Sequence, residues 1–509
     1  MGRERVLSRP GVNKVLHGGN FMKNLQADVV IIGTGPAGLA ASVEASEAGL
    51  KVIAFEKQNV SGGAANMGMG PLGIGTRQQQ DQMVDIDVER AFKMFMEYTH
   101  WRVDANMVKK YFEASAGTIE WLEDLGVIFA GAYKYFPKSE ATWHIVSPNG
   151  VVGNEGIGRN GGAVMNKAML DRAQENGAEF FYETPAKEIL RDADGKICGV
   201  NAVAKDGEEI HVDCKAVVVA TGGAGDSPEY MKERMGYTFG KDLFNIVIPG
   251  LKGEGIKMAI AAGAATTEMT VEKIYILPSS DMGVQSVPVV FMQPNLLVNV
   301  QGKRFINEEQ MQNTTFTGNA IQIQKGAVGF SIIDSSIIKT YKKKGLDVVN
   351  FVHHVSDIDD FEQACQDIFN DPTNPDVVIA DTLEELAEKC GIDVDNFLET
   401  VEEYNDMCES EDTQFYKPSK FMKPIKKGPF YAGLFRPSGY GTLGGIKINE
   451  NCEVLDDDWN VIPGFYAAGT DTCTIYGDSY MFLLPGNTMG YCVNTGRFAG
   501  QGVAEYCEE

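Results

Sequence analysis

The hydrophobic pattern predicts two buried strands, with a helix between them, near the start of the chain. Residues 27–32 read A-D-V-V-I-I, an apolar run typical of a parallel strand buried on both faces. The segment 33–38 (G-T-G-P-A-G) follows directly, and residues 39–49 have helical periodicity. A second apolar run, K-V-I-A-F (51–55), predicts a strand that ends at Glu56.

This order of strand, glycine turn, helix, strand and acid predicts a dinucleotide site. Gly33 permits the tight turn, Gly35 lets a pyrophosphate approach the backbone, and Gly38 allows the helix to pack on the strand. The helix N-terminus then faces the phosphates, while the Glu56 carboxylate binds ribose hydroxyls. An acid rather than an arginine at this position argues against a 2′-phosphate. The turn alone does not distinguish FAD from NAD.

Three further segments favour FAD. The loop S-G-G-A-A-N-M-G-M-G (61–70) is rich enough in glycine to lie against a large flat ligand, and A-V-V-V-A-T-G-G-A-G (216–225) predicts a strand ending in a glycine turn. Residues 461–471 and 484–491 precede a predicted final helix, whose N-terminus would stabilise negative charge near N1 and C2=O of a reduced flavin. The residues predicted to bind FAD are Gly33, Gly35, Pro36, Ala37, Gly38, Glu56, Lys57, Gly62, Gly63, Ala64, Asn66, Gly68, Ala186, Ala220, Thr221, Gly222, Gly469, Asp471, Gly486, Asn487, Thr488 and Met489.

Charge excludes some classes of partner. The formal net charge is −25, so the chain repels phosphate backbones and anionic lipid, and no nucleic-acid partner is expected. Residues 355–415 hold 20 acidic residues and one lysine, so one segment carries most of the excess. No stretch approaches 18 apolar residues, and no membrane span is predicted.

The nine cysteines contain no C-x-x-C pair, which excludes a ferredoxin-type cluster and a zinc ribbon by spacing and fits a reducing compartment. The sequence therefore predicts a cytoplasmic protein without a metal site. The pair His353-His354 has no third ligand nearby and is expected to be solvated. Residues 1–26 are basic and lack the apolar core of a secretory signal, so they are expected to form a loosely ordered arm.

Eight ordered motifs carry a family resemblance. They are the glycine turn at 33–38, A-T-G-G-A-G (220–225), G-E-G-I-K-M-A-I-A-A-G-A (253–264), N-x-x-G-K-R-F-I-N-E (299–308), the D-T-L-E-E-L-A and V-E-E-Y-N segments within 381–405, G-P-F-Y-A (428–432), T-L-G-G (442–445) and I-P-G-F-Y-A-A-G (462–469). With them the chain resembles, over about 27–505, the flavoproteins of fumarate reductase and succinate dehydrogenase. The similarity is to the soluble branch, near urocanate reductase and the 3-ketosteroid dehydrogenases.

The resemblance implies an α/β protein with a Rossmann-like FAD-binding domain and an inserted α+β capping domain. The FAD domain would comprise 27–271 and 441–509, and the cap 272–440. FAD would exchange hydride at N5 with a substrate held beneath the cap. Family members that attach FAD covalently do so through a histidine in the glycine loop. This loop has Ala64-Ala65-Asn66 instead, so FAD is expected to be non-covalent.

The cationic residues that bind and protonate a dicarboxylate in this family are absent at the matching positions, which are Leu277, Gln312, Gly441 and Tyr480. A dicarboxylate in a dry pocket without cations loses several kcal/mol per uncompensated charge, so fumarate is not the expected substrate. Tyr480 and Tyr440 are the predicted catalytic residues, because a phenol can bind a carbonyl oxygen or transfer a proton. Tyr476 is a weaker candidate.

The predicted function is hydride transfer between FAD and the C=C or CH–CH bond of an α,β-unsaturated carbonyl compound, as an ene-reductase or a dehydrogenase. Two alternatives stay open: an electron-transfer flavoprotein subunit with a decayed substrate site, and a fumarate reductase-like dicarboxylate reductase. The electron donor is expected to be NAD(P)H or a redox protein, since no haem motif, iron–sulfur spacing or second dinucleotide turn is present.

Two further sets of residues have structural and functional interpretations. Tyr133, Tyr135, Trp143 and His144 lie in an aromatic-rich loop that forms either a surface or a lid over the substrate. Arg304 and Glu308 are expected to be a structural pair at the domain junction rather than catalytic residues.

Overall fold

The computed structural model describes residues 14–17, 20–147, 160–277, 285–349, 352, 355, 357–374 and 376–508. The pair His353-His354 lies outside the described residues, so its predicted role stays a prediction.

A six-stranded sheet forms the centre of the nucleotide-binding part. Its strand order is β17-β18-β11-β3-β4-β7, in which β17 runs antiparallel and the others are parallel. All residues of β3 and β4 are buried, as expected for strands covered on both faces, and the predicted α/β class is confirmed. The strands are β3 (Val29–Ile32), β4 (Val52–Phe55), β7 (Glu179–Phe181), β11 (Ala216–Val219), β17 (Glu453–Leu455) and β18 (Val461–Ala467).

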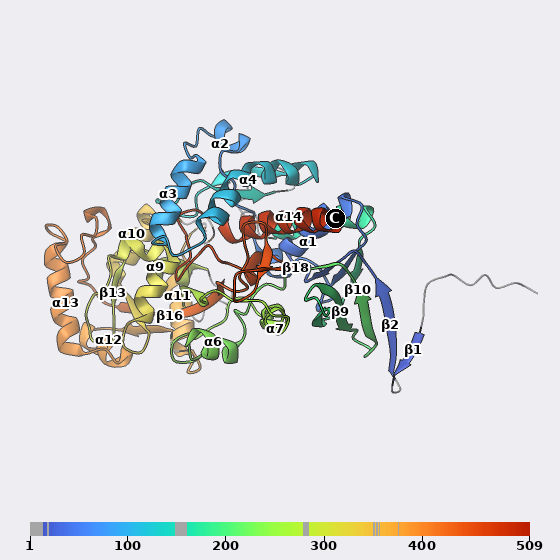
Figure 1. Cartoon of the computed structure of the whole chain (residues 1–509). Coiled ribbons are helices and arrows are strands. Elements are labelled where there is room, and N and C mark those ends of the chain that lie inside the picture. Colours follow the sequence, from blue (N-terminus) through green and yellow to red (C-terminus); the bar gives the residue numbers. More distant parts are fainter. Residues whose placement is uncertain are drawn as a thin grey trace, which may run out of the picture.

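Two long helices, α1 (Pro36–Glu47) and α14 (Asn487–Glu508), pack against each other and against this sheet (Figure 1). They approach closely because Gly496 has no side chain: a Cβ there would collide with the carbonyl oxygen of Ala37. No helix in the described ranges is long and apolar enough to cross a membrane. The other helices of this part are η1 (Gly63–Met67), α2 (Arg77–Asp81), α3 (Val88–Tyr98), α4 (Ala105–Asp124), α5 (Gly161–Glu175), α6 (Pro228–Met235), α7 (Glu254–Ala261) and η5 (Gly469–Asp471).

A second sheet, of order β1-β2-β10-β9-β8, lies at the opposite end of the molecule from the cap (Figure 1). Its strands are β1 (Lys14–His17), β2 (Asn20–Gln26), β8 (Ala186–Arg191), β9 (Ile197–Val203) and β10 (Glu209–Asp213). The expected loosely ordered arm is therefore wrong for residues 20–26, because β2 pairs in parallel with β10 and this pairing satisfies its main chain. A separate hairpin pairs β5 (Phe129–Tyr133) with β6 (Trp143–Val146).

The cap is built on a third sheet, in which the 14-residue strand β16 (Phe430–Leu443) pairs with three others. The remaining strands are β12 (Thr270–Ile276), β13 (Leu296–Val298), β14 (Gly329–Asp334) and β15 (Val377–Ala380). The helices are α8 (Ser286–Phe291), η3 (Glu308–Gln312), α9 (Thr314–Gln322), α10 (Ser335–Lys344), α11 (Phe361–Asn370), α12 (Leu383–Cys390), α13 (Val394–Met407) and η4 (Ser419–Phe421).

The buried apolar residues form two large clusters. One draws on residues 29–269 and 443–503, and the other on residues 275–435. The division predicted from the sequence, 27–271 with 441–509 and 272–440, stays a prediction. Strand β16 runs from the second cluster to the first, and β12 pairs beside it, so the two paired strands connect the lobes.

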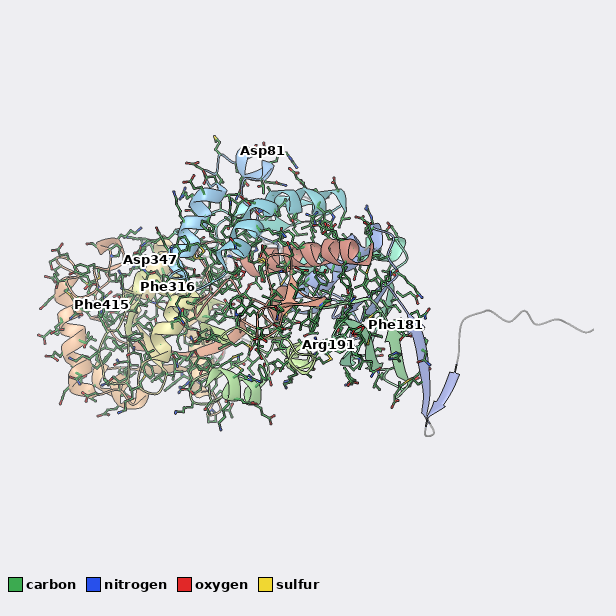
Figure 2. All side chains as sticks on the ribbon, in the orientation of Figure 1. Asp81, Phe181, Arg191, Phe316, Asp347 and Phe415 are labelled. Atoms are coloured by element: carbon green, nitrogen blue, oxygen red, sulfur yellow. The ribbon has the colours of Figure 1, made fainter. Side chains whose placement is uncertain are left out.

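The lobes also touch through side chains. Phe316 of α9 stacks on Tyr98 of α3, with ring centroids 5.6 Å apart, and Figure 2 labels Phe316 beside the cap helices. Asn319 of α9 donates a hydrogen bond to the Ser479 hydroxyl at 3.0 Å. These contacts place α9 over the segment that holds Tyr480.

Arg304 lies in a buried ion cluster inside the cap. Its guanidinium donates paired hydrogen bonds to Glu308 (2.8 and 2.9 Å) and to Asp412 (2.8 and 3.0 Å), while Lys417 lies 3.5 Å from Glu308. Phe415, labelled at the edge of the cap in Figure 2, lies against the guanidinium. Two cations balance two anions, so the structure supports the expected structural role of Arg304 and Glu308.

We expect Asp412→Ala to destabilise the cap strongly. Although burial opposes ionisation of Asp412, hydrogen bonds from Arg304 and Lys417 hold its pKa well below the usual range. Removing it leaves two buried cations, Arg304 and Lys417, with one anion, Glu308. The expected loss is about 3–5 kcal/mol in the free energy of unfolding, measured by urea denaturation with circular dichroism. Glu399→Ala, which removes the exposed pair of Lys303 with Glu399, is the matched control and costs less than about 1 kcal/mol. Equal effects would contradict the structural role of the cluster.

Candidate active site

A cavity of about 1110 Å³ lies where the first parallel strands end and the cap begins. One end is lined by the glycine turn after β3, by Glu56 and by the loop that contains η1. The other end is lined by β12, β16, the start of α9 and the segment before α14. The cavity is therefore long enough to hold a dinucleotide at one end and a second, smaller molecule at the other.

The glycine turn leaves room for a phosphate. Gly33 has φ +94°, and a Cβ there would collide with Ala220, while a Cβ at Gly38 would collide with the carbonyl oxygen of Gly33. A Cβ at Gly35 would meet no atom within 4 Å, so the space in front of it is open. No side chain caps the N-terminus of α1, whose N–H groups stay available to an anion.

The Glu56 carboxylate is held at the end of β4. One oxygen accepts hydrogen bonds from the Thr34 N–H (3.0 Å) and hydroxyl (2.8 Å), and the other accepts from the Gln58 N–H (2.9 Å). This fixes the carboxylate in the cavity wall, where ribose hydroxyls would donate to it. The neighbouring Lys57 makes contacts within the protein: its ammonium donates hydrogen bonds to the Gly250 carbonyl and the Glu254 carboxylate.

Four predicted FAD residues do not line the cavity and act behind it. Gly38 lets α1 approach the turn, and Gly62 lies at φ +108° beside Asn66. The Asp471 carboxylate accepts hydrogen bonds from the N–H groups of Thr221 and Gly223, so it holds the turn after β11. Asn487 accepts a hydrogen bond from the Tyr476 hydroxyl at 2.9 Å.

The other eighteen predicted FAD residues line the cavity. Their roles toward the cofactor stay predictions. Around η1, Asn66 donates to Ser61 at 2.9 Å and accepts from Asn166 at 2.9 Å, so hydrogen bonds within the protein hold the loop shape.

Both predicted catalytic tyrosines face the cavity. Tyr480 is buried, and its hydroxyl accepts a hydrogen bond from the Thr488 N–H (3.1 Å) at the start of α14. Tyr440 lies deep in the protein, yet 40% of its surface is accessible because it borders the cavity. The Tyr480 hydroxyl also interacts with the Thr488 side chain. The Tyr440 hydroxyl has no hydrogen-bond partner among the described residues, so it can donate to a ligand. Tyr476 also lines the cavity, but its hydroxyl is occupied by Asn487.

Glu272 of β12 is a cavity residue that the sequence analysis missed. It is 4% exposed, and burial raises the pKa of its carboxyl to about 8. Its signal in the sequence is a single acid in the run V-E-K-I-Y-I-L (271–277), which resembles a strand on a solvated surface. Thr314, at the start of α9, was also missed; its hydroxyl lines the cavity and is buried without a hydrogen-bond partner.

The residues of the aromatic-rich loop differ in position, because some line the cavity and one is buried in the core. Tyr135 and Trp143 line the cavity, and the Tyr135 ring packs against Phe482 with centroids 4.7 Å apart. His144 is fully buried, hydrogen-bonds to Thr76 at 2.7 Å, and has its pKa lowered to about 4 by burial. It is therefore a neutral core residue, and Tyr133 does not reach the cavity.

Cationic lining residues lie only at the nucleotide end of the described cavity: Lys57, Lys187 and Lys257. At the other end the lining contains Glu272 but no lysine, arginine or histidine among the residues described. The described chain also contains no group of three or more His, Cys, Asp or Glu side chains that could hold a metal ion.

Comparison with known proteins identifies the family. The FAD binding domain family matches residues 28–488. A vinyl phenol reductase of Lactiplantibacillus plantarum is 30% identical over 95% of this chain and 97% of its own length. A fumarate reductase (cytochrome) of Shewanella frigidimarina is 28% identical over 95% of this chain and 78% of its own. The structure of a 3-ketosteroid-Δ4-(5α)-dehydrogenase from Rhodococcus jostii, in complex with 4-androstene-3,17-dione, has a TM-score of 0.73 and 25% identity, over 94% of this chain and 97% of its own.

The chain belongs to the fumarate reductase-type branch of this FAD-binding family. It is an FAD-dependent oxidoreductase that acts on CH–CH groups, as the sequence predicted. The open space at Gly35, the uncapped start of α1 and the fixed Glu56 carboxylate fit this cofactor.

We expect Gly35→Ala to weaken FAD binding without unfolding the protein. The new Cβ meets nothing in the protein, but it enters the space that the pyrophosphate needs. The dissociation constant should rise at least roughly tenfold, a cost of about 1.4 kcal/mol, in titrations of apoprotein followed by flavin fluorescence.

Gly117→Ala is the matched control, because Gly117 lies exposed in α4, far along the chain from the cavity lining, and its Cβ also meets nothing. Equal FAD affinity in both variants would show that the phosphates do not approach Gly35.

Proposed function

We propose that the chain reduces the C=C bond of an uncharged, conjugated substrate, an α,β-unsaturated carbonyl compound or an alkene similarly conjugated to an oxygen-bearing ring. FAD would be held non-covalently, since the loop at 61–70 has no histidine. The observation that carries the proposal is the charge of the substrate end of the cavity: a buried Glu272 and no cation among the described lining residues.

A carboxylate substrate would meet unfavourable electrostatics there. A buried anion without a partner loses its hydration with no compensating attraction, which costs several kcal/mol. Glu272 supplies no compensating positive charge, and burial raises the pKa of its carboxyl to about 8 and so keeps it mostly neutral at pH 7. An uncharged substrate avoids the penalty, and the rings of Tyr135, Tyr480 and Phe482 offer it an apolar wall.

The chain's own residues would hold the substrate oxygen. Tyr480 is oriented by the Thr488 N–H and by its own main chain, whose carbonyl accepts a hydrogen bond from Tyr98 at 2.7 Å. The Tyr440 hydroxyl, and that of Tyr480 when it turns from the Thr488 side chain, would donate a hydrogen bond to the substrate oxygen. At a carbonyl oxygen this bond draws electrons from the alkene, and at a phenol oxygen it reduces the donation of electrons into the alkene. Bound flavin supplies hydride transfer at N5.

Two similarities support an uncharged substrate. The relative with 30% identity is named for a vinyl phenol, and the steroid dehydrogenase structure holds 4-androstene-3,17-dione; neither compound carries a carboxylate. The electron donor in this proposal is NAD(P)H or a redox protein. We place the activity in the cytoplasm, because all nine cysteines are free thiols.

Matched substrate pairs test the proposal. Dithionite-reduced holoenzyme is mixed anaerobically with methyl cinnamate or cinnamate, with 4-vinylphenol or 4-coumarate, and with a steroidal enone, urocanate or fumarate. Flavin reoxidation is followed by stopped-flow absorbance. We expect the uncharged member of a pair to react at least about 100-fold faster, since an uncompensated charge costs several kcal/mol.

Dithionite makes the result independent of the natural donor. Rapid reoxidation by fumarate or urocanate would refute the proposal in favour of a carboxylate reductase. Failure of every alkene would favour an electron-transfer subunit with a decayed site.

The proposed role of Tyr480 has its own test. Tyr480→Phe removes the hydroxyl that donates to the substrate oxygen, and the reoxidation rate should fall roughly tenfold, the value of one hydrogen bond. Tyr133→Phe is the control, because Tyr133 lies outside the cavity lining. The FAD content of both variants should match the wild type. An unchanged rate in Tyr480→Phe would remove this tyrosine from the site.

A further inference from the structure

Glu272 lies opposite an irregularity in the pairing of β12 with β16. Val271 pairs with Thr442 and Lys273 with Gly439, so the single residue Glu272 lies opposite two residues, Tyr440 and Gly441. This is a β-bulge whose extra residue is on β16; bulges redirect side chains of the bulged strand and are common beside active sites. Glu272 and Tyr440, on opposite sides of the bulge, both line the cavity.

The Glu272 carboxyl has no hydrogen bond or ion pair with any part of the chain that the structure describes. A Cβ at Gly441 would lie 3.9 Å from its Oε2. Lys273, the next residue, lies on the opposite face of the strand, where its ammonium contacts the Tyr237 hydroxyl at 2.9 Å. A buried carboxyl without a partner in the protein is available to a ligand.

The groups that face this carboxyl are uncharged at neutral pH. Tyr440 of β16, Tyr98 of α3, and Cys473 and Tyr480 near the C-terminus are close enough to interact with its charge. Helix α9, which packs on β12, contains no titratable residue. Helix α6 packs on the other face of β12, through Met231 against Val271, and its charged residues are exposed.

We propose that Glu272 is the catalytic proton donor, which transfers its carboxyl proton to the alkene carbon that does not receive hydride. This inference rests on the proposed function. Hydride from the flavin brings two electrons and one hydrogen to one carbon, and the proton from Glu272 completes the other, so C=C becomes CH–CH. The Glu272 carboxylate is left behind and regains its proton from water.

Acidity favours Glu272 over the tyrosines. Burial raises the pKa of the Glu272 carboxyl to about 8, so it is mostly protonated at neutral pH and still gives up its proton readily. Burial, followed by the nearby Glu272, raises the pKa of Tyr440 to about 12, and burial raises that of Tyr480 further still. The tyrosines are therefore better suited to hold the substrate oxygen.

The test compares Glu272→Gln and Glu272→Asp with Glu268→Gln in the holoenzyme. Glu268 precedes the same strand, but its side chain is 86% exposed and pairs with Arg102. With the fastest uncharged substrate, reoxidation should fall at least 100-fold in Glu272→Gln, recover in part in Glu272→Asp and stay unchanged in Glu268→Gln. In the wild type the rate should decline as pH rises through about 8, because the acid form is the donor. That decline should vanish in Glu272→Gln.

A second readout does not depend on turnover. Infrared difference spectra of the oxidised holoenzyme should show a carboxylic-acid C=O band that titrates near pH 8 and is missing from Glu272→Gln. Absence of the band from the wild type, or a Glu272→Gln rate within tenfold of wild type, would overturn the proposal. If Glu272→Gln does not fold, two measurements still test the proposal: the carboxylic-acid band of the wild type, and the pH dependence of reoxidation in the wild type and in Glu272→Asp. Failure of the proposed function is distinguishable, because then no uncharged alkene reoxidises even the wild type.

Discussion

The pairing of β12 with β16 makes one connection between the lobes out of two segments that are far apart in the chain. The two strands run side by side from the nucleotide-binding part into the cap, and main-chain hydrogen bonds between them stiffen this connection. A one-residue bulge on β16 lies in the same pair, opposite Glu272, and both Glu272 and Tyr440 line the cavity there. The connection between the lobes and this part of the cavity wall thus depend on one pair of strands.

The ionisable groups buried inside the cap and the carboxyl buried in the cavity have different surroundings. In the cap, Arg304 and Lys417 lie with Glu308 and Asp412, so the buried charges balance and their hydrogen bonds are satisfied. In the cavity, Glu272 has no such partner among the described residues. Burial raises the pKa of its carboxyl to about 8, so the neutral form of this side chain is favoured at neutral pH.

Features that depend on local sequence were predictable. The glycine turn at 33–38 is close in the chain to the next strand and to Glu56. Because backbone sterics restrict such short segments, their order predicts how they lie relative to one another. The family resemblance predicted the position of Tyr480. Glu272 was not predictable, because the cavity that its side chain lines is formed with residues far along the chain, such as Tyr440 and Tyr480.

The same limit applies to other residues. Asp471 and Asn487 were predicted to bind FAD, which stays a prediction: they do not line the cavity, and their side chains hold the turn after β11 and the Tyr476 hydroxyl. Their sequence context indicates proximity to the cofactor but not which side of the cavity wall they occupy. Residues 20–26 form a strand through pairing with β1 and β10, and β10 is far along the chain.

The contact of Asp471 with Thr221 has a consequence for how the protein is made. These residues are 250 positions apart, and the cap lies between them in the chain. During synthesis the cap emerges with its own apolar core while β11 still lacks its neighbour β18. The turn that faces the cofactor therefore becomes fixed only after the segment with Asp471 has left the ribosome, so capture of FAD is expected to follow synthesis of the cap.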